Sequence, residues 1–138
     1  MPQIDFHILP DSDGRLLYTC RLAEKAYRRD HTVCILADNP QQADELDRLL
    51  WTFREGSFVP HERCEEGFDE LTPVLITATF PLPRRDVLIT LASVMPESLD
   101  AFDRMIEVVD QTPDILAGSR DRFRRYRQQG QSPEVIKL

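Results

Sequence analysis

Three short segments of apolar, mostly β-branched or leucine residues constrain the fold most. They are TVCILA (32–37), PVLITAT (73–79) and DVLITLA (86–92), and none of them shows a regular alternation of apolar and polar residues. A strand that is almost wholly apolar is typical of a sheet covered on both faces, as parallel sheets are. The sequence therefore predicts a parallel sheet that has helices packed on its two faces.

The N-terminal part of the chain follows the order β-α-β-α. Residues 3–9 alternate apolar and polar side chains, and residues 10–14 (PDSDG) form a turn sequence. A helix is predicted over residues 15–29, and the first apolar segment follows it. A second helix begins at Asn39-Pro40, because asparagine suits the N-cap and proline suits the first helical turn. Alternating strands and helices indicate a Rossmann-like α/β fold.

The rest of the chain adds further strands and one long helix. Residues 54–72 are predicted to be irregular, and residues 104–110 are the last clear strand. The final helix starts after Thr112, which is expected to cap it, and ends before Gly130. The tail QSPEVIKL is expected to be extended. No repeat or linker divides the sequence, so we expect a single domain, residues 1–138, whose βαβ sheet is flanked by helices.

The turn after the first strand lacks the chemistry of a phosphate-binding loop. Its sequence, LPDSDGR, contains one glycine, Gly14, and two aspartates, and it matches neither GxGxxG nor GxxxxGK[ST]. Aspartates repel phosphate, and one glycine cannot build a cradle of amides. His61 and Cys64 are close in sequence, but no second pair completes a tetrahedral metal site. We therefore expect no metal, no cofactor and no catalytic residues.

The cysteines and the hydropathy pattern indicate a cytoplasmic protein. Cys20, Cys34 and Cys64 are odd in number and widely spaced, which favours reduced thiols over a disulfide framework. The first residues do not have the pattern of a signal peptide. No apolar run approaches the ~20 residues that a membrane-spanning helix needs.

The charge of the chain is negative overall but uneven. The net charge is −7, which argues against broad nucleic-acid binding. Residues 120–127 contain five arginines and one aspartate, a local charge of +4 that leaves −11 for the remainder. A small cationic region on an acidic protein suits a short acidic ligand better than a long polyanion.

An aromatic cluster is the first candidate binding surface. Trp51, Phe53 and Phe58 lie at the end of the second predicted helix and in the loop after it, and Val59-Pro60 follow. Trp51 lies about 100° around the helix from the apolar face and has polar neighbours. Aromatic residues in such a place often anchor protein interfaces. The alternative, that Trp51 simply covers a sheet edge, stays open on the pattern alone.

The C-terminal helix is the second candidate. Arg120, Phe123, Arg124 and Arg127 share one helical face at spacings i, i+3, i+4 and i+7. Guanidinium groups bind carboxylates through two hydrogen bonds, and the ring could contact an apolar ligand group. A peptide C-terminus with acidic neighbours is one such ligand. The alternative is a solvated helix face with Phe123 partly buried.

Several segments along the chain resemble the chi subunit of bacterial DNA polymerase III. They are DFHILP, LAEKAYRRDHTV, LDRLLWTFREGSFVPH, RRDVLITL, EVVD and SRDRFRRYRQQG. The most specific string is LW-x(6)-FVPH, residues 50–61. The resemblance implies a single α/β domain with a Rossmann-like sheet and a non-catalytic adaptor that works in DNA replication.

The resemblance also implies two protein partners. The psi subunit, which connects chi to the clamp loader, would bind the surface of Trp51 and Phe58, and we assign Phe53, Val59 and Pro60 to the same interface. The acidic C-terminal tail of single-stranded DNA-binding protein would bind Arg120, Phe123 and Arg124, with Arg127 beside them. Two alternatives are direct binding of single-stranded nucleic acid by the arginine-rich helix and a divergent nucleotide-dependent enzyme.

Overall fold

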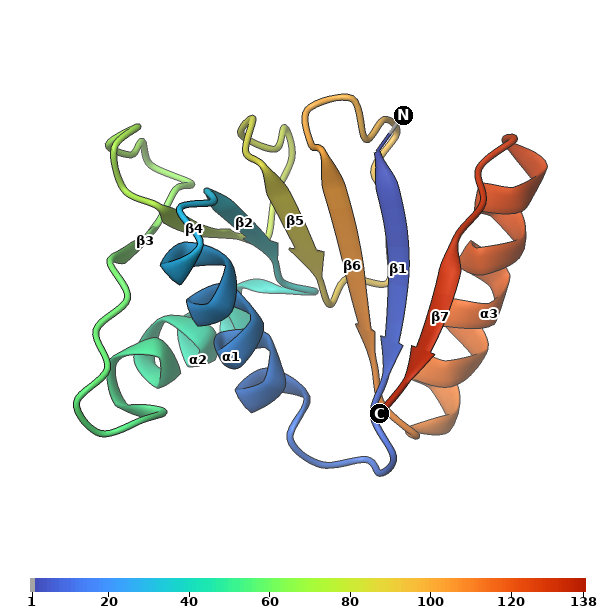
Figure 1. Cartoon of the computed structure of the whole chain (residues 1–138), viewed down its shortest axis with the longest axis horizontal. Helices are drawn as coiled ribbons and strands as arrows, with labels where there is room; N and C mark the ends of the chain where they lie inside the picture. The colour runs from blue at the N-terminus through green and yellow to red at the C-terminus, as the bar shows by residue number, and fades with distance from the viewer. Residues whose placement is uncertain (1) are drawn as a thin grey trace.

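The computed structural model describes residues 2–138 as a parallel seven-stranded sheet with helices packed against it (Figure 1). The strand order is β3-β4-β2-β5-β6-β1-β7. The strands are β1 (Gln3–Ile8), β2 (Val33–Leu36), β3 (His61–Arg63), β4 (Val74–Thr77), β5 (Val87–Thr90), β6 (Arg104–Val109) and β7 (Glu134–Lys137). The helices are α1 (Arg15–Arg28), α2 (Pro40–Thr52) and α3 (Pro113–Gln128). The predicted Rossmann-like α/β fold is confirmed.

The central strands are apolar because both of their faces are covered. Every residue of β2, β4 and β5 is buried. In β2, Val33 and Ile35 pack into the core cluster that includes α1 and α2, whereas Cys34 and Leu36 pack into the cluster on the α3 side. The two clusters therefore form two apolar layers, one on each face of the sheet.

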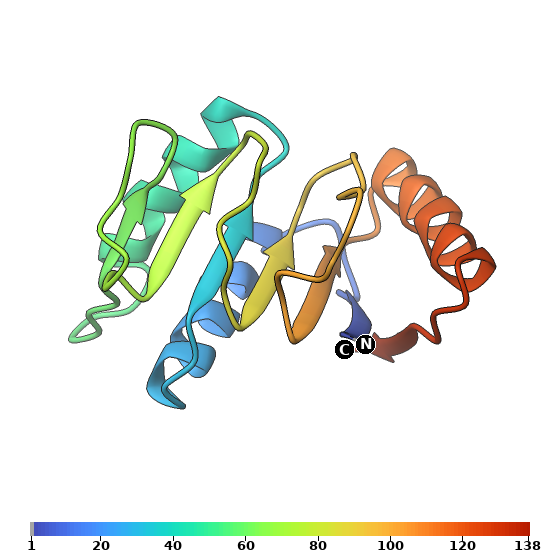
Figure 2. The same ribbon diagram turned by 90° about the horizontal axis from the view of Figure 1, so that it is seen from above.

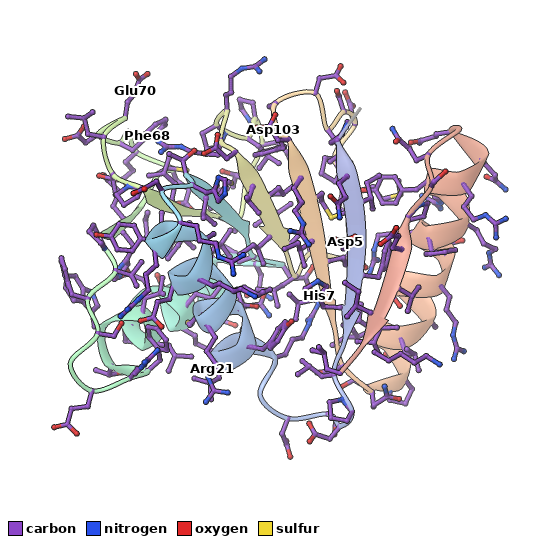
Figure 3. All side chains as sticks on the ribbon, viewed as in Figure 1. Asp5, His7, Arg21, Phe68, Glu70 and Asp103 are labelled. Atoms are coloured by element: carbon purple, nitrogen blue, oxygen red, sulfur yellow. The ribbon has the colours of Figure 1, made fainter. Side chains whose placement is uncertain are left out.

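Strand β1 is different because it has one apolar and one polar face. Ile4 and Phe6 pack into the cluster on the α3 side. Asp5 and His7, labelled in Figure 3, alternate with them and carry the polar face of the strand. Asp5 is fully buried and accepts two hydrogen bonds from the Arg104 guanidinium, at 2.9 and 2.6 Å. The Arg104 guanidinium on the neighbouring strand β6 thus stabilises a buried carboxylate on β1.

The helices lie over different parts of the sheet. Helices α1 and α2 lie over the half of the sheet that contains β4, β2 and β5, and α3 lies beside β7 at the other end (Figures 1 and 2). Asn39 caps α2 as predicted, since its side chain accepts a hydrogen bond from the Gln42 amide. Thr112 is the N-cap residue of α3, but the predicted side-chain cap is absent.

The structure corrects the sequence prediction in residues 54–72. Within this segment, which we predicted to be irregular, His61–Arg63 form the short edge strand β3. The side chains of β3 are polar, and the strand is defined by its pairing with β4, which lies ten or more residues away in sequence. The C-terminal tail is extended as expected and forms β7, which pairs in parallel with β1.

Candidate functional site

Trp51 and Phe58 form an exposed aromatic pair, which we call the aromatic surface. Trp51 lies in the last turn of α2 and Phe58 in the following loop, and their side chains are 55% and 61% exposed. Their ring centroids are 5.6 Å apart, and His61 lies behind Trp51 at 4.7 Å. The His61 imidazole hydrogen-bonds to the carbonyls of Val59 and Asp47 at 2.7 and 3.0 Å. The exposure of Trp51, which the sequence left open, is thus settled.

The other three residues of the predicted aromatic interface lie deeper. Phe53 is partly buried and packs against the core cluster under α2, and Pro60 is also partly buried. Val59 is 1% exposed and belongs to the core. The Val59 side chain is therefore not available to a partner, and it fixes the loop after α2 on the core of the domain.

A buried carboxylate holds the loop that carries Phe58. Glu24 of α1 accepts a hydrogen bond from the Arg54 guanidinium at 2.7 Å and a second one from the Ser57 hydroxyl. The hydrogen bond from Ser57 is the main reason why the pKa of Glu24 lies below its usual value, and the neighbouring arginines lower it further. Sequence reasoning missed this contact because residues 24 and 54–57 belong to different elements.

The second surface is a cavity of about 500 Å³ between α3 and β7, which we call the α3–β7 cavity. Arg120, Phe123 and Arg124 line it from α3, and Val135 and Lys137 line it from β7. The cavity combines apolar walls with cationic groups, which is how pockets orient a small acidic ligand.

Phe123 rests on the sheet at the base of the α3–β7 cavity. Its ring meets the ring of Phe6 edge to face, with centroids 5.5 Å apart. Phe6 and Ile8 of β1 also line the cavity, so its inner wall is apolar. Phe123 is partly buried, as the alternative interpretation of the helix face expected, and it still lines the cavity.

The structure brings three of the four predicted α3 residues together. Arg127, the fourth, is exposed but does not line the cavity, although it shares the helical face. Sequence reasoning missed Val135 and Lys137. They could have been found from the geometry of a strand, in which every second side chain points to the same face. In Glu134–Lys137 these are Val135 and Lys137, which face α3 once the tail pairs with β1.

Arg122 belongs to the same arginine-rich segment but is buried. Its guanidinium donates two hydrogen bonds to Oε1 of Glu107 on β6, at 2.8 and 2.6 Å, and one to the Ser93 carbonyl at 3.0 Å. Gly118 gives this side chain room, because a Cβ there would lie 3.0 Å from Nη1 of Arg122. Gly118 therefore marks a place where α3 packs closely against the Arg122 side chain.

Arg15 lies at the carboxyl edge of the sheet, which is the edge where Rossmann-like folds bind nucleotides. Arg15 opens α1, and its Nε and Nη2 donate to the carbonyls of Val108 and Leu91 at 2.8 and 2.9 Å. These carbonyls lie at the carboxyl ends of β6 and β5. A side chain of the protein itself thus takes the space beside the turn that lacks a phosphate-binding loop.

The remaining candidates for a chemical site in residues 2–138 are the cysteine thiols and the side chains that could bind a metal ion. Burial raises the pKa of Cys20 to about 12 and also raises that of Cys34, so both are thiols at neutral pH. No group of three His, Cys, Asp or Glu side chains in this part of the chain is arranged to hold a metal ion. No helix there has the length and apolar character required to span a bilayer.

These features define a Rossmann-like α/β protein that lacks a phosphate-binding loop after β1 and whose prominent surfaces are an aromatic pair and a cationic cavity. Residues 1–134 match the family model described as "DNA polymerase III chi subunit, HolC". The chain belongs to this family and is therefore an accessory protein of bacterial DNA replication.

Curated relatives carry the same name. A DNA polymerase III subunit chi from Pseudomonas aeruginosa is 40% identical over 133 residues, which cover 94% of this chain and 92% of that protein. The subunit chi of Haemophilus influenzae is 32% identical over 113 residues, 80% of this chain and 78% of its own. That of Escherichia coli K12 is 31% identical over 113 residues, covering 80% and 77%. The family implies partners within the polymerase holoenzyme.

The buried Glu107–Arg122 pair makes a prediction about stability. Replacing Arg122 by methionine leaves the Glu107 carboxylate buried without its partner, which should lower the free energy of unfolding by about 3–5 kcal/mol near pH 8. The matched variant Arg125→Met removes an exposed arginine that pairs with Asp121, and it should cost less than about 1 kcal/mol. Urea unfolding of both variants measures the difference.

The same pair also predicts a pH dependence. Burial raises the pKa of Glu107, and Arg122 opposes this effect. Without Arg122 the pKa should rise further, and a raised pKa in the folded state adds stability at low pH that is lost as pH rises. The deficit of Arg122→Met should therefore shrink between about pH 8 and about pH 5. If the loss of unfolding free energy in Arg122→Met stays constant or grows as the pH falls over this range, Glu107 is not the group that Arg122 stabilises.

Proposed function

We propose that this chain is a non-catalytic adaptor that binds the psi subunit on its aromatic surface and the acidic tail of single-stranded DNA-binding protein in its α3–β7 cavity. The observation that carries the proposal is the cavity itself, where Arg120, Phe123 and Arg124 converge beside an apolar wall. The curated relatives are named as subunits of DNA polymerase III, which supports an accessory role.

The cavity has the features required to bind a peptide C-terminus. An apolar side chain of the peptide would pack on Phe123 and Val135, while Arg120 and Arg124 bind its carboxylates. Lys137 adds a third cation from the opposite wall. Both arginine side chains are exposed, so water and salt weaken each ion pair. The affinity should therefore be modest and should fall as salt is added.

The aromatic surface has the features of an interface anchor. Trp51 and Phe58 expose adjacent rings. His61 packs against Trp51, and the hydrogen bonds to Glu24 fix the loop that carries Phe58. A pair of aromatic side chains that is already fixed loses little conformational freedom on binding, which favours affinity. Covering such rings removes apolar area from water, which is the usual source of binding energy at the centre of an interface.

The distribution of charge favours a peptide ligand over single-stranded DNA in the α3–β7 cavity. Arg122 is neutralised by Glu107, and Arg124 and Arg125 lie 3.7 and 3.1 Å from Asp121. The arginine-rich segment therefore presents fewer unpaired cations than its sequence suggests. A protein with a net charge of −7 also repels a long polyanion.

Substitution of Arg120 by alanine should weaken binding of the tail peptide about tenfold, because a charge-assisted contact to carboxylate is lost. The control is Arg125→Ala, which removes an arginine of the same helix that does not line the cavity. Calorimetric titration with a peptide copying the organism's own tail measures both affinities. Equal affinities for wild type and Arg120→Ala would show that the cavity is not the tail site.

Substitution of Trp51 by alanine should weaken binding of the psi subunit at least about thirtyfold, since a central aromatic anchor contributes ~2 kcal/mol or more. Phe80→Ala is the matched control, because Phe80 is also an exposed aromatic residue but lies in the loop after β4. If Trp51→Ala binds psi as the wild type does, or if both variants lose the same affinity, psi does not bind on the aromatic surface.

A further inference from the structure

A second group of cations lies along α1, at its C-cap and in the loop after α2, on a different part of the molecule from the α3–β7 cavity. We call it the α1 ridge. Its cationic members line one shallow depression together with Glu24, and they are Arg21, Lys25, Arg28, Arg29 and Arg54. Five cations and one carboxylate give the ridge a local charge of +4 on a protein whose net charge is −7.

Most of the positive charge of the α1 ridge is not neutralised. Glu24 is buried and pairs with Arg54 at 2.7 Å and Arg28 at 3.6 Å. Arg21, Lys25 and Arg29 are exposed, and no carboxylate in residues 2–138 lies within 4.0 Å of their charged atoms. Figure 3 shows Arg21 on the outer side of α1. Three cations are thus available to a ligand from solvent.

The α1 ridge is joined to the aromatic surface through one residue. Glu24 binds both Arg54 and Ser57, and these two residues belong to the loop between Trp51 and Phe58. Arg54 lines the ridge, and Ser57, which is bonded to Glu24 of the ridge, directly precedes the exposed Phe58. A partner that covers the aromatic surface lies next to the ridge.

We propose that the α1 ridge binds an acidic segment of the same protein partner that covers the aromatic surface. This inference rests on the proposed docking of psi there, and it adds the kind of sequence that the partner must carry. The segment would lie along α1 with its carboxylates on Arg21, Lys25 and Arg29, and it would approach the rings through Arg54.

The dimensions of the ridge set the length of this segment. Arg21 to Arg29 spans about 12 Å at the rise of an α-helix. An extended peptide covers that length with about four residues. Arginine binds carboxylate in a planar, two-bonded geometry, so two or three Asp or Glu residues within the segment match the unpaired cations. A long phosphate backbone would extend beyond the ridge onto the acidic remainder of the protein.

The test compares four full-length proteins as partners of the source organism's psi subunit. They are the wild type, Trp51→Ala, the ridge variant Arg21→Glu/Arg29→Glu, and the charge-matched control Arg84→Glu/Arg125→Glu, whose residues lie outside the ridge. Calorimetric titration at about 50 mM and about 500 mM salt separates electrostatic from apolar contributions. Circular dichroism confirms that each variant is folded.

The expected result is a loss of about tenfold or more in affinity for the ridge variant at low salt, against about twofold for the control. The loss should largely disappear at high salt, whereas the effect of Trp51→Ala should persist. A ridge variant that equals the control, while Trp51→Ala is impaired, would overturn the ridge alone. A Trp51→Ala protein that binds normally, or a wild type that does not bind psi, would overturn the proposed docking and the ridge with it.

A parallel titration with a single-stranded oligonucleotide of about ten thymidines tests whether the α1 ridge binds nucleic acid instead of an acidic peptide segment. The account predicts no measurable binding to the wild type at about 150 mM salt. Oligonucleotide binding that the ridge variant loses, together with unchanged psi binding, would assign the α1 ridge to nucleic acid and overturn the proposal.

Discussion

Glu107 and Arg122 form a buried ion pair between the sheet and α3, and the position of that helix depends on it. The pair fixes the helix on β6, and the same guanidinium reaches the Ser93 carbonyl in the loop after β5. Gly118 leaves room for this arrangement, because a Cβ there would lie only 3.0 Å from Nη1 of Arg122. With α3 held in this way, Phe123 contacts Phe6, and the space between the helix and β7 becomes a cavity.

A second buried carboxylate, Glu24, has a similar role on the other side of the protein. It ties α1 to the loop after α2, and this contact sets the position of Phe58 beside Trp51. Each of the two surfaces is therefore built on an element whose position is fixed by a buried carboxylate: Glu107 for α3, and Glu24 for the loop after α2. Breaking either support should be costly, since an unpaired buried carboxylate destabilises the fold more than an exposed ion pair stabilises it.

The sequence predicted the architecture well where local patterns decide it. The apolar runs identified β2, β4 and β5, and the alternation in β1 identified a strand with one polar face. Strand β3 was missed because its order comes from pairing with β4, a contact that no local pattern reveals. The cavity was half predicted, since the α3 residues share a helical face but β7 joins them only through its pairing with β1.

The two proposed binding surfaces lie on different elements, one at the end of α2 and the other between α3 and β7 (Figure 1). An adaptor must bind both partners at once. The most direct test is titration of the tail peptide of single-stranded DNA-binding protein into this chain alone and into its preformed complex with psi. The account predicts a ternary complex and peptide affinities that agree within about twofold. Release of psi by the peptide, or loss of peptide binding in the complex, would contradict the adaptor function.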